Sequence, residues 1–282
     1  MLASFTTLKV AVVGHLEWVQ FARVGNVPRA GEIAHAHGLF EEPAGGGAVA
    51  AVQMARLAGS ATFFTALGED ELGRRSLERL SELGVRVCSA TRKAPTRRAL
   101  TLLDEHAERT ITTFGERLEP LAEDELPWGE LASMDAVFFT AGDRGALVAS
   151  RAASKLVATP RARHALGQAI ELDALVLSKD DEHERREAAN TLADAELEVL
   201  TDGEHGGGYR TRAGDSGSWK PAKLPGEPVD SYGCGDSFAG GLTCALGAGL
   251  ELERALELAA RCGATCMTGH GPYERQLSAE DL

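Results

Sequence analysis

The order of elements in the sequence predicts an α/β fold with a doubly wound, mostly parallel sheet, helices on both faces, and a small separate β-sheet. From residue 135 onward, apolar runs typical of buried strands alternate with helical stretches, which is the pattern of a parallel sheet covered by helices. Two earlier segments, 16–40 and 96–114, have strand-forming residues broken by turns, as exposed strands do. A length of 282 residues with 44% hydrophobic and only 5% aromatic residues suits one large α/β domain with a small attachment.

The first part of the chain begins with a short apolar run that is typical of a buried parallel strand and ends at Gly14. Glycine and proline then punctuate residues 16–40, and EEPAGGG is expected to break the chain at 41–47. The elements predicted in this part are strands at 8–14 and 61–68, and helices at 48–58 and 70–84.

The remaining elements follow from the same patterns. Residues 96–103 and 109–114 are rich in β-forming residues and flank a polar turn, so we expect them to join the strands of 16–40 in the small sheet. A loop is expected at 203–228. The predicted strands are 135–142, 155–160, 172–178 and 197–203, and the predicted helices lie near 144–153, 162–169, 182–194, 237–249 and 252–269.

Composition narrows the class of protein. A net charge of −13 does not favour nucleic acid as a partner, because an acidic surface repels phosphate backbones. The cysteines, Cys88, Cys234, Cys244, Cys262 and Cys266, lack the spacing of a zinc site and are expected to be reduced thiols of a cytoplasmic protein. The first residues do not look like a signal peptide, and no apolar run is long enough to span a bilayer.

The most informative segment is DSYGCGDSFAGG, residues 230–241, in which a Gly-x-Gly-Asp turn opens directly into an apolar helix. Glycines allow close approach of a ligand to the backbone, and the free N–H groups of a helix start attract negative charge. Asp236 at this helix start is placed to accept a proton from an attacking hydroxyl, and the helix dipole should keep it ionised. The alternative is that Asp236 is only a helix N-cap.

The segment 230–243, DSYGCGDSFAGGLT, closely resembles the C-terminal signature of the ribokinase-like carbohydrate kinases of the phosphofructokinase B type. Residues 44–59, AGGGAVAAVQMARLAG, resemble the N-terminal glycine signature of the same family, and the order of elements fits from residue 8 to about residue 275. The resemblance implies an enzyme that transfers the γ-phosphoryl group of ATP to a hydroxyl of a sugar-like substrate.

The resemblance also implies roles for individual residues. Asp236 would be the general base, and Gly233, Cys234 and Gly235 would form the anion hole. The acceptor would contact Gly45 and Gly46, and Glu17 is the candidate where the family usually has an Asp after the first strand. Apart from the resemblance, Arg109 is a candidate to bind a phosphate or carboxylate of the substrate, with an ordinary charged surface as the alternative, and Asp143 follows a strand end where open α/β sheets bind ligands. ATP would bind near Thr201, Gly203, Gly206, Ala264 and Gly269. Asp230 and Ser231 match a pair that helps to hold a monovalent cation such as K⁺.

This sequence departs from the family pattern at the acceptor and magnesium sites. Val49 stands where the N-terminal signature has an Asn, which removes a polar sugar contact and argues against ribose. The Asn-x-x-Glu motif that orders Mg²⁺ is expected after residues 172–178, where the chain instead reads SKDDE. Asp181 or Glu182 is a candidate Mg²⁺ ligand there, and a solvated acidic helix start is the alternative.

The domain prediction and the rival functions complete the hypothesis. Residues 1–15, 43–95 and 119–282 are expected to form the nucleotide-binding core, and 16–42 and 96–118 a lid that covers the substrate and mediates a homodimer. The main alternative function is an inactive relative that binds a sugar or nucleotide as a sensor. A nicotinamide dehydrogenase is disfavoured because GGGAVA at 45–50 does not follow a strand, and a P-loop kinase because the chain has no Gly-x-x-x-x-Gly-Lys-Ser/Thr loop.

Overall fold

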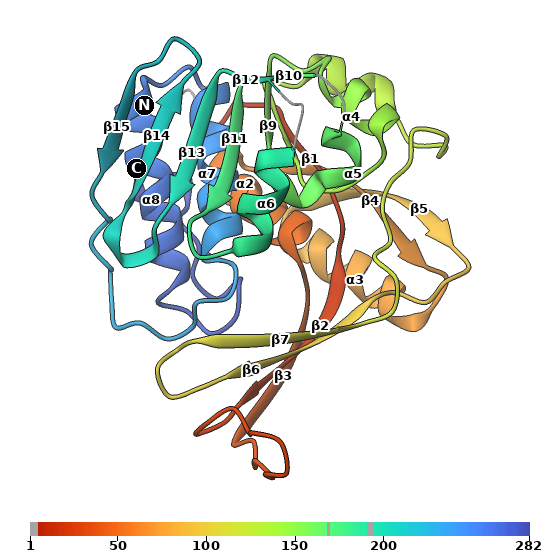
Figure 1. Cartoon of the computed structure of the whole chain (residues 1–282). Helices are drawn as coiled ribbons and strands as arrows, with labels where there is room; N and C mark the ends of the chain where they lie inside the picture. Colours follow the sequence, from red (N-terminus) through yellow and green to blue (C-terminus); the bar gives the residue numbers. More distant parts are fainter. Residues whose placement is uncertain (1–4, 168–169, 191–193) are drawn as a thin grey trace.

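A computed structural model describes residues 5–167, 170–190 and 194–282. Within these residues the main sheet has nine strands in the order β15-β14-β13-β11-β9-β8-β1-β4-β5 (Figure 1). All neighbouring pairs are parallel except β13–β14 and β14–β15. Its strands are β1 (Val10–Val13), β4 (Ala61–Gly68), β5 (Val85–Arg92), β8 (Ala136–Phe139), β9 (Lys155–Ala158), β11 (Ala174–Ser178), β13 (Leu197–Thr201), β14 (Gly207–Thr211) and β15 (Ser216–Trp219).

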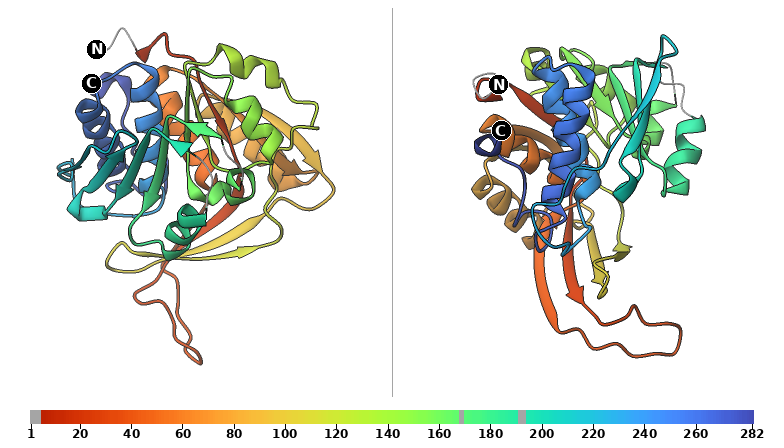
Figure 2. Two further views of the ribbon diagram at one scale, coloured as in Figure 1. Left: turned by 45° about the horizontal axis from the view of Figure 1, so that its top comes forward. Right: turned by 90° about the vertical axis from the view of Figure 1, so that its left-hand side faces the viewer.

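Helices cover both faces of this sheet, as the two views in Figure 2 show. Strand β1 illustrates the division, since Val10 and Val12 pack in one hydrophobic cluster and Ala11 and Val13 in the other. The first cluster contains side chains of α2, α7 and α8, and the second contains those of α4 and α5. These helices are α2 (Gly46–Ala58), α7 (Cys234–Gly247), α8 (Leu252–Cys266), α4 (Arg144–Ser150) and α5 (Arg163–Leu166), while α3 (Glu71–Glu82) and α6 (Glu182–Asn190) complete the set. The predicted fold class is confirmed.

A second sheet crosses below the main one in Figure 1 and has the order β3-β2-β6-β7. Strands β2 (Glu17–Arg23) and β6 (Arg98–Leu103) pair in parallel, while β3 (Gly38–Ala44) and β7 (Arg109–Phe114) pair antiparallel on the outside. Phe21 of β2 stacks on Phe40 and meets Tyr232 edge-on, with ring centroids 4.6 and 4.9 Å apart. These aromatic contacts join the small sheet to the segment that enters α7.

Three local expectations differ from the structure. Residues 41–44 continue strand β3, and the chain turns only at Gly45, because Glu41 and Glu42 pair with β2. The loop expected at 203–228 contains the antiparallel pair β14–β15, which extends the main sheet. Strand β5 follows α3 directly and was not predicted.

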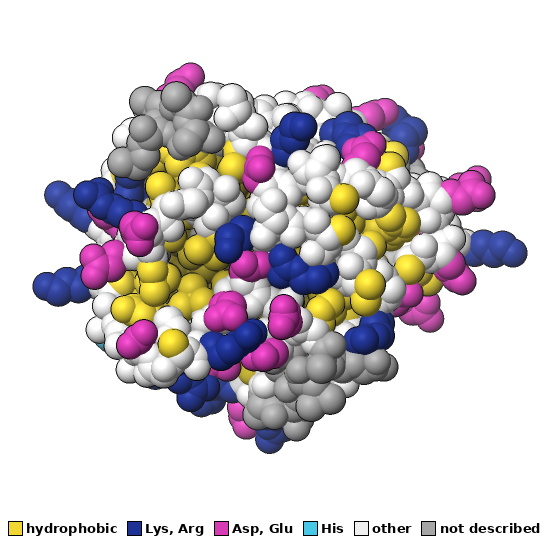
Figure 3. All heavy atoms as spheres, turned by 90° about the horizontal axis from the view of Figure 1, so that it is seen from above, with side chains coloured by type: hydrophobic (Ala, Val, Ile, Leu, Met, Phe, Trp, Pro, Cys, Tyr) yellow, Lys and Arg dark blue, Asp and Glu magenta, His cyan; other side chains and the backbone are white. Residues whose placement is uncertain are grey.

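Smaller elements and the outer surface complete the description. A two-stranded parallel pair, β10 (Glu171–Leu172) and β12 (Asp194–Ala195), lies outside the main sheet, and the short 3₁₀ turns are η1 (Trp128–Ser133), η2 (Pro160–Ala162), η3 (Gly203–His205) and η4 (Ala279–Asp281). Seen from above, acidic and basic side chains are interspersed among apolar ones (Figure 3). Among the described residues, every helix is too short or too polar to cross a bilayer.

Candidate active site

The site lies at the carboxyl edge of the parallel strands, where open α/β sheets bind ligands. The chain builds β4 and β5 on one side of β1, and β8, β9, β11 and β13 on the other, so the switch point lies between β1 and β8. His15 follows β1 and Thr140 follows β8 at this point. Arg117 joins the two, because its Nη2 lies 3.0 Å from His15 Nδ1 and donates to the Thr140 carbonyl at 2.7 Å.

The two glycine-rich segments predicted from sequence face each other across this edge. Gly45 has a φ of +88° and donates its N–H to the Tyr232 hydroxyl at 3.1 Å, so the start of α2 is tied to the segment before α7. A Cβ placed on Gly46 would lie 2.9 Å from Asp236 Oδ1 and 3.4 Å from Thr140 Oγ1. The absence of a side chain at Gly46 therefore leaves the carboxylate of Asp236 accessible at this edge.

Asp236 lies in the first turn of α7, while the N-cap is Gly233, with φ +83°. The alternative that Asp236 is only an N-cap is therefore wrong. Within the described chain its carboxylate accepts no hydrogen bond, and the side chain is half-buried. Burial raises the pKa of Asp236 above its ordinary value, against the opposing effect of Arg161 and Arg109. Contrary to the expectation of a helix-dipole effect, burial dominates this pKa, and a more basic carboxylate is the better proton acceptor.

The residues of the predicted anion hole form the turn into α7. A Cβ on Gly233 would lie 3.0 Å from Val49 Cγ1, so Val49 packs behind the turn and is fully buried there. Gly235, in contrast, is exposed and has open space on the side where a Cβ would stand. The N–H groups of the first helical turn have no acceptor within the helix. Cys234 N–H donates to the Ser231 carbonyl at 3.5 Å, and the turn leaves open space at Gly235, next to Asp236 in the chain.

Glu17 lies on the other side of the glycine turn. It is 6% exposed, and a Cβ on Gly45 would lie 3.3 Å both from Glu17 Cγ and from His15 Nε2. Arg97 Nε lies 3.5 Å from Glu17 Oε2. Burial raises the pKa of Glu17, while Arg97 and Arg117 act against burial. His15, Arg97 and Arg117 were not predicted as members of the site, and no local motif marks them.

A further residue that the sequence analysis missed is Glu184. It is 7% exposed, accepts the Ser178 N–H at 2.7 Å and binds Arg161 Nε at 2.5 Å. Its charge contributes to the raised pKa of Asp236. Asp181 and Glu184 keep the spacing of the Asn-x-x-Glu motif, with Asp in the first position, and this spacing was the available signal.

The predicted magnesium ligands separate in the structure. Asp181 caps α6 through the amides of His183 and Glu184 and approaches Arg161 Nη2 at 3.1 Å. The side chain of Glu182 is instead 68% exposed and pairs with Arg186, whereas that of Glu184 is buried. The described residues contain no group of three or more His, Cys, Asp or Glu that would form a metal site by themselves.

The predicted cation pair has other partners. Asp230 is fully buried, and its two carboxylate oxygens accept the amides of Tyr232 at 2.8 Å and Gly271 at 2.9 Å. Arg109 of β7 donates to both the carbonyl and the hydroxyl of Ser231, at 3.2 and 3.0 Å. Asp230 therefore ties the turn before α7 to residues near 271, and Arg109 links the small sheet to the same turn.

The predicted nucleotide residues lie at the end of β13 and along α8. Thr201 ends β13, Gly203 and Gly206 follow it with φ of +50° and +87°, and Ala264 is half-buried on α8. A Cβ on Gly206 would lie 2.2 Å from the Trp219 carbonyl, and one on Gly269 would lie 2.8 Å from Arg275 N. Both glycines are thus required for backbone packing.

Asp143 is not part of the group around Asp236. Its Oδ1 accepts the amides of Ala146 at 2.8 Å and Ala122 at 3.0 Å, so it caps α4 and fixes the preceding loop. The substrate role considered for it has no support in these contacts. Capping accounts for an Asp at this position.

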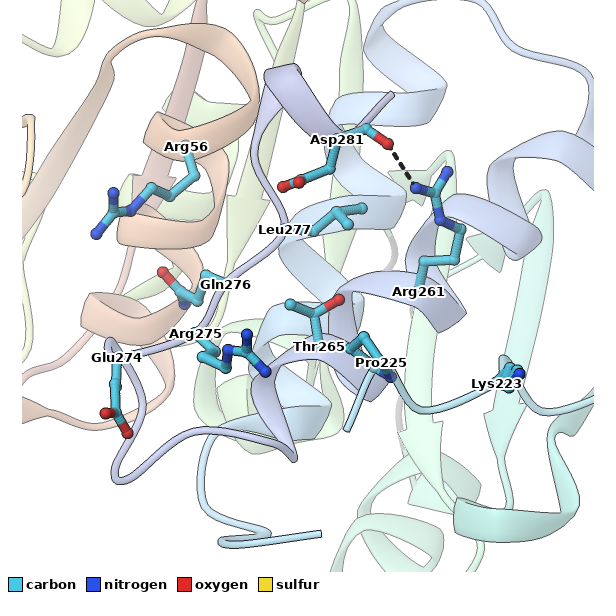
Figure 4. Close-up of a pocket in the computed structure, with 10 residues that line it drawn as sticks. All are labelled: Arg56, Lys223, Pro225, Arg261, Thr265, Glu274, Arg275, Gln276, Leu277 and Asp281. Atoms are coloured by element: carbon cyan, nitrogen blue, oxygen red, sulfur yellow. Dashed lines mark hydrogen bonds between the residues drawn. The ribbon is translucent and has the colours of Figure 1, made fainter. Parts of the chain in front are cut away.

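A hollow of about 470 Å³ beside α8 is separate from this site (Figure 4). Arg261 and Thr265 of α8, Arg56 of α2 and Lys223 line it, and Arg261 donates to the Asp281 carbonyl at 2.7 Å. Asp236 is not among the residues that line it. We therefore place the chemistry at the sheet edge and not in this hollow.

The comparisons with known proteins agree with the fold. A family model described as pfkB family carbohydrate kinase matches residues 7–167 and 147–279. A putative ribokinase from Agrobacterium tumefaciens has a TM-score of 0.77 at 20% identity, over 97% of this chain and 95% of that one. A ribokinase from Arabidopsis thaliana, solved with ribose and ATP, has a TM-score of 0.75 at 18% identity, over 98% and 97% of the two chains. The search of curated proteins gave no match.

Proposed function

Because the chain belongs to the pfkB family of carbohydrate kinases, we propose that it transfers the γ-phosphoryl group of ATP to a hydroxyl of a small sugar-like acceptor, with Asp236 as the general base. The observation that carries the proposal is the unpaired carboxylate of Asp236, which lies beside Gly46 of the second glycine segment and at the mouth of α7. A carboxylate without a hydrogen-bond donor, at a helix start that attracts anions, suits proton abstraction next to a phosphoryl group.

In this mechanism the acceptor hydroxyl approaches Asp236 from the side of Gly45 and Gly46. Glu17 accepts hydrogen bonds from other hydroxyls of the acceptor, since one of its carboxylate oxygens has no hydrogen-bond partner in the described chain. Asp236 takes the proton as the oxygen attacks the γ-phosphorus. The amides of Gly233, Cys234 and Gly235 then stabilise the charge on the transferred group, a contribution of about 10²–10³-fold where one such donor has been removed from enzymes.

ATP would bind over the ends of β11 and β13, near Thr201 and Gly203, with its adenine toward Ala264 of α8. Asp181 and Glu184 fit a role in holding Mg²⁺ through water, because hard carboxylate oxygens suit this ion, both residues follow β11, and the charge of Glu184 acts on Asp236. When bound, Mg²⁺ supplies positive charge to the β- and γ-phosphates. The side-chain contacts of Asp230 and Ser231 give no particular support to a K⁺ site.

The small sheet would act as the lid over the acceptor, because Arg109 at its far strand already contacts the turn before α7. Large apolar side chains are exposed on this sheet and on the segment between β2 and β3, which favours a dimer through this region; these are Leu39, Ile111 and Phe114 of the sheet and Ile33 of the segment. Light scattering of the protein tests the dimer.

Turnover tests the proposal and separates it from an inactive sensor. Incubation with Mg-ATP and a panel of sugars, nucleosides and sugar acids should release ADP, and Asp236→Asn should lower kcat by at least about 10²-fold. Glu253→Gln removes an exposed carboxylate from the first turn of α8 and is the matched control. Full activity of Asp236→Asn would refute the general base, and binding without turnover across the panel would favour the sensor.

A further inference from the structure

Two arginines of the small sheet reach the turn that leads into α7, and both meet the backbone next to Asp230. Arg23 of β2 donates from Nη2 to the Val229 carbonyl at 2.8 Å. Arg109 of β7 donates from Nη1 to the Ser231 carbonyl at 3.2 Å. The carbonyls on either side of Asp230 therefore each accept a guanidinium N–H. Within the described part of the chain, neither arginine forms an ion pair with an acidic side chain.

The hairpin of β6 and β7 occupies the polar groups of Ser231. The Ser231 N–H donates to the Ala107 carbonyl at 3.1 Å, and Arg109 donates to the Ser231 hydroxyl oxygen at 3.0 Å as well as to the carbonyl. The same carbonyl also accepts the Cys234 N–H at 3.5 Å. A carbonyl oxygen has two lone pairs, and both are used here. Ser231, one member of the pair predicted to hold a monovalent cation, thus holds a guanidinium instead, and the donor set does not fit K⁺.

The position of Asp230 calls for positive charge. Its side chain is fully buried, and a buried carboxylate is costly unless hydrogen bonds and positive charge compensate it. Burial raises the pKa of Asp230, whereas the amides of Tyr232 and Gly271 and the charges of Arg23 and Arg109 act to lower it. The two arginines therefore provide positive charge that favours the ionised form of this carboxylate.

The charge of Arg109 also acts on the proposed base and anion hole. Burial raises the pKa of Asp236, and the charges of Arg161 and Arg109 oppose this rise. The contact with Cys266 and burial raise the pKa of the Cys234 thiol, and Arg109 again acts in the opposite direction. Fixed positive charge beside this turn stabilises a negatively charged group that is transferred in front of it.

The arginines thus bring to the turn both the hydrogen-bonding partners and the charge that a bound cation brings to a set of carbonyls. Building on the proposed kinase activity, we propose that Arg109, supported by Arg23, supplies the positive charge of a monovalent cation at this turn, so that the enzyme does not require K⁺.

Exchange of the salt in the assay tests this inference. Each acceptor that turns over is assayed with Mg-ATP, added as the Tris salt of ATP, in choline chloride and in KCl at equal ionic strength. Mg-ATP binding is measured in the same two salts by titration calorimetry without an acceptor. We expect kcat and the Kd for Mg-ATP of the wild type to agree between the two salts within about 2-fold, which is no more than one weak hydrogen bond contributes.

Variants of Arg109 separate its charge from its contacts. Arg109→Gln should lower kcat in choline chloride by about 10- to 100-fold, as expected for one or two hydrogen bonds from a charged group, and KCl should restore much of this loss. Arg109→Lys keeps the charge, so it should lose less activity than Arg109→Gln and gain nothing from KCl. Arg29→Gln removes the same charge from an exposed position between β2 and β3 and is the matched control, with wild-type behaviour in both salts.

Activation of the wild type by KCl, or binding of Mg-ATP that is tighter by about 10-fold in KCl, overturns the inference. Wild-type kcat of Arg109→Gln in choline chloride also overturns it, and so does a loss that KCl does not reduce, because a purely structural contact would give that result. If no acceptor turns over, the kinase proposal fails and the calorimetry decides. The inference then stands if KCl tightens Mg-ATP binding to Arg109→Gln but not to the wild type, and it falls otherwise.

Discussion

Gly235→Ala should make the protein more stable and less active. Gly235 is the second residue of α7, its φ is outside the left-handed region, and no heavy atom outside its immediate surroundings lies within 4 Å of the added methyl. Alanine is favoured over glycine in a helix, so the free energy of unfolding should rise by about 0.5–1 kcal/mol. For a chain of this size that corresponds to about 1–3 °C in Tm. The methyl group would nevertheless occupy the open space in front of the anion-hole amides, and kcat should fall by about 10²-fold or more.

Gly233→Ala is the contrasting variant. Gly233 has φ +83°, and the new methyl would meet Val49 Cγ1 at 3.0 Å and Pro272 Cβ at 3.2 Å, so this variant should lose both stability, by at least about 1–2 kcal/mol, and activity. Thermal denaturation gives the stability of each variant, and a coupled assay of ADP release gives kcat. If Gly235→Ala keeps wild-type kcat, the phosphoryl group is not held in front of this turn and the anion hole must be placed elsewhere.

The remaining predictions concern pH, charge and stability. Because burial raises the pKa of Asp236, and only the ionised carboxylate accepts a proton, kcat/KM should fall as the pH drops through a midpoint above the ordinary value of 3.8; a profile that stays flat below that value would contradict the assignment. Glu184 raises this pKa and Arg161 lowers it, so Glu184→Gln should move the acid limb of the profile to lower pH and Arg161→Gln to higher pH, and movement in the same direction would refute the electrostatic account. Asp70→Ala should cost about 1–3 kcal/mol in urea unfolding at pH 7, because Asp70 caps α3 through Gly73 and binds both the N–H and the hydroxyl of Thr96. Burial acts to raise the pKa of Asp70, but these hydrogen bonds outweigh burial and hold the pKa below 3.8. The stabilisation by the Asp70 carboxylate is therefore present above pH 3.8 and is lost as the pH falls through the lower pKa of the folded state. A difference in stability between the wild type and Asp70→Ala that persists at low pH would point to another cause.

Local sequence was sufficient where the determinants are close together in the chain. The Gly-x-Gly-Asp turn before α7 and the glycine turn before α2 each combine backbone freedom with a helix start, and both occur in the structure. The pair β14–β15 was missed because GGYRT and SGSW are rich in glycine and serine, which are poor strand formers, and only pairing at the sheet edge stabilises them. Glu184 was not predicted because Asp181 replaces the Asn of the motif, so that only the spacing to Glu184 is retained.

Local sequence patterns did not predict the residues of the acceptor pocket. His15, Arg97, Arg117 and Arg161 lie far apart in the sequence, and each is an ordinary residue in its own segment. They meet because β1 and β8 are neighbours at the switch point and because Arg97 and Arg117, on two of the connections to the small sheet, contact residues there. Proximity of this kind depends on the topology of the fold. Local patterns in the sequence therefore do not predict which of these residues are neighbours.

The strand order also sets the direction of the proposed reaction along the sheet edge. Across the sheet edge, the strands β13, β11, β9, β8 and β1 follow one another. Thr201 ends the first, Glu184 follows the second, Arg161 follows the third, and Thr140 and His15 follow the last two. A phosphoryl group that passes from ATP to an acceptor must therefore move along this edge past Arg161. In the proposed reaction, an acceptor that enters from the β8–β1 side would pass Arg97 and Arg117 before its hydroxyl reaches Asp236.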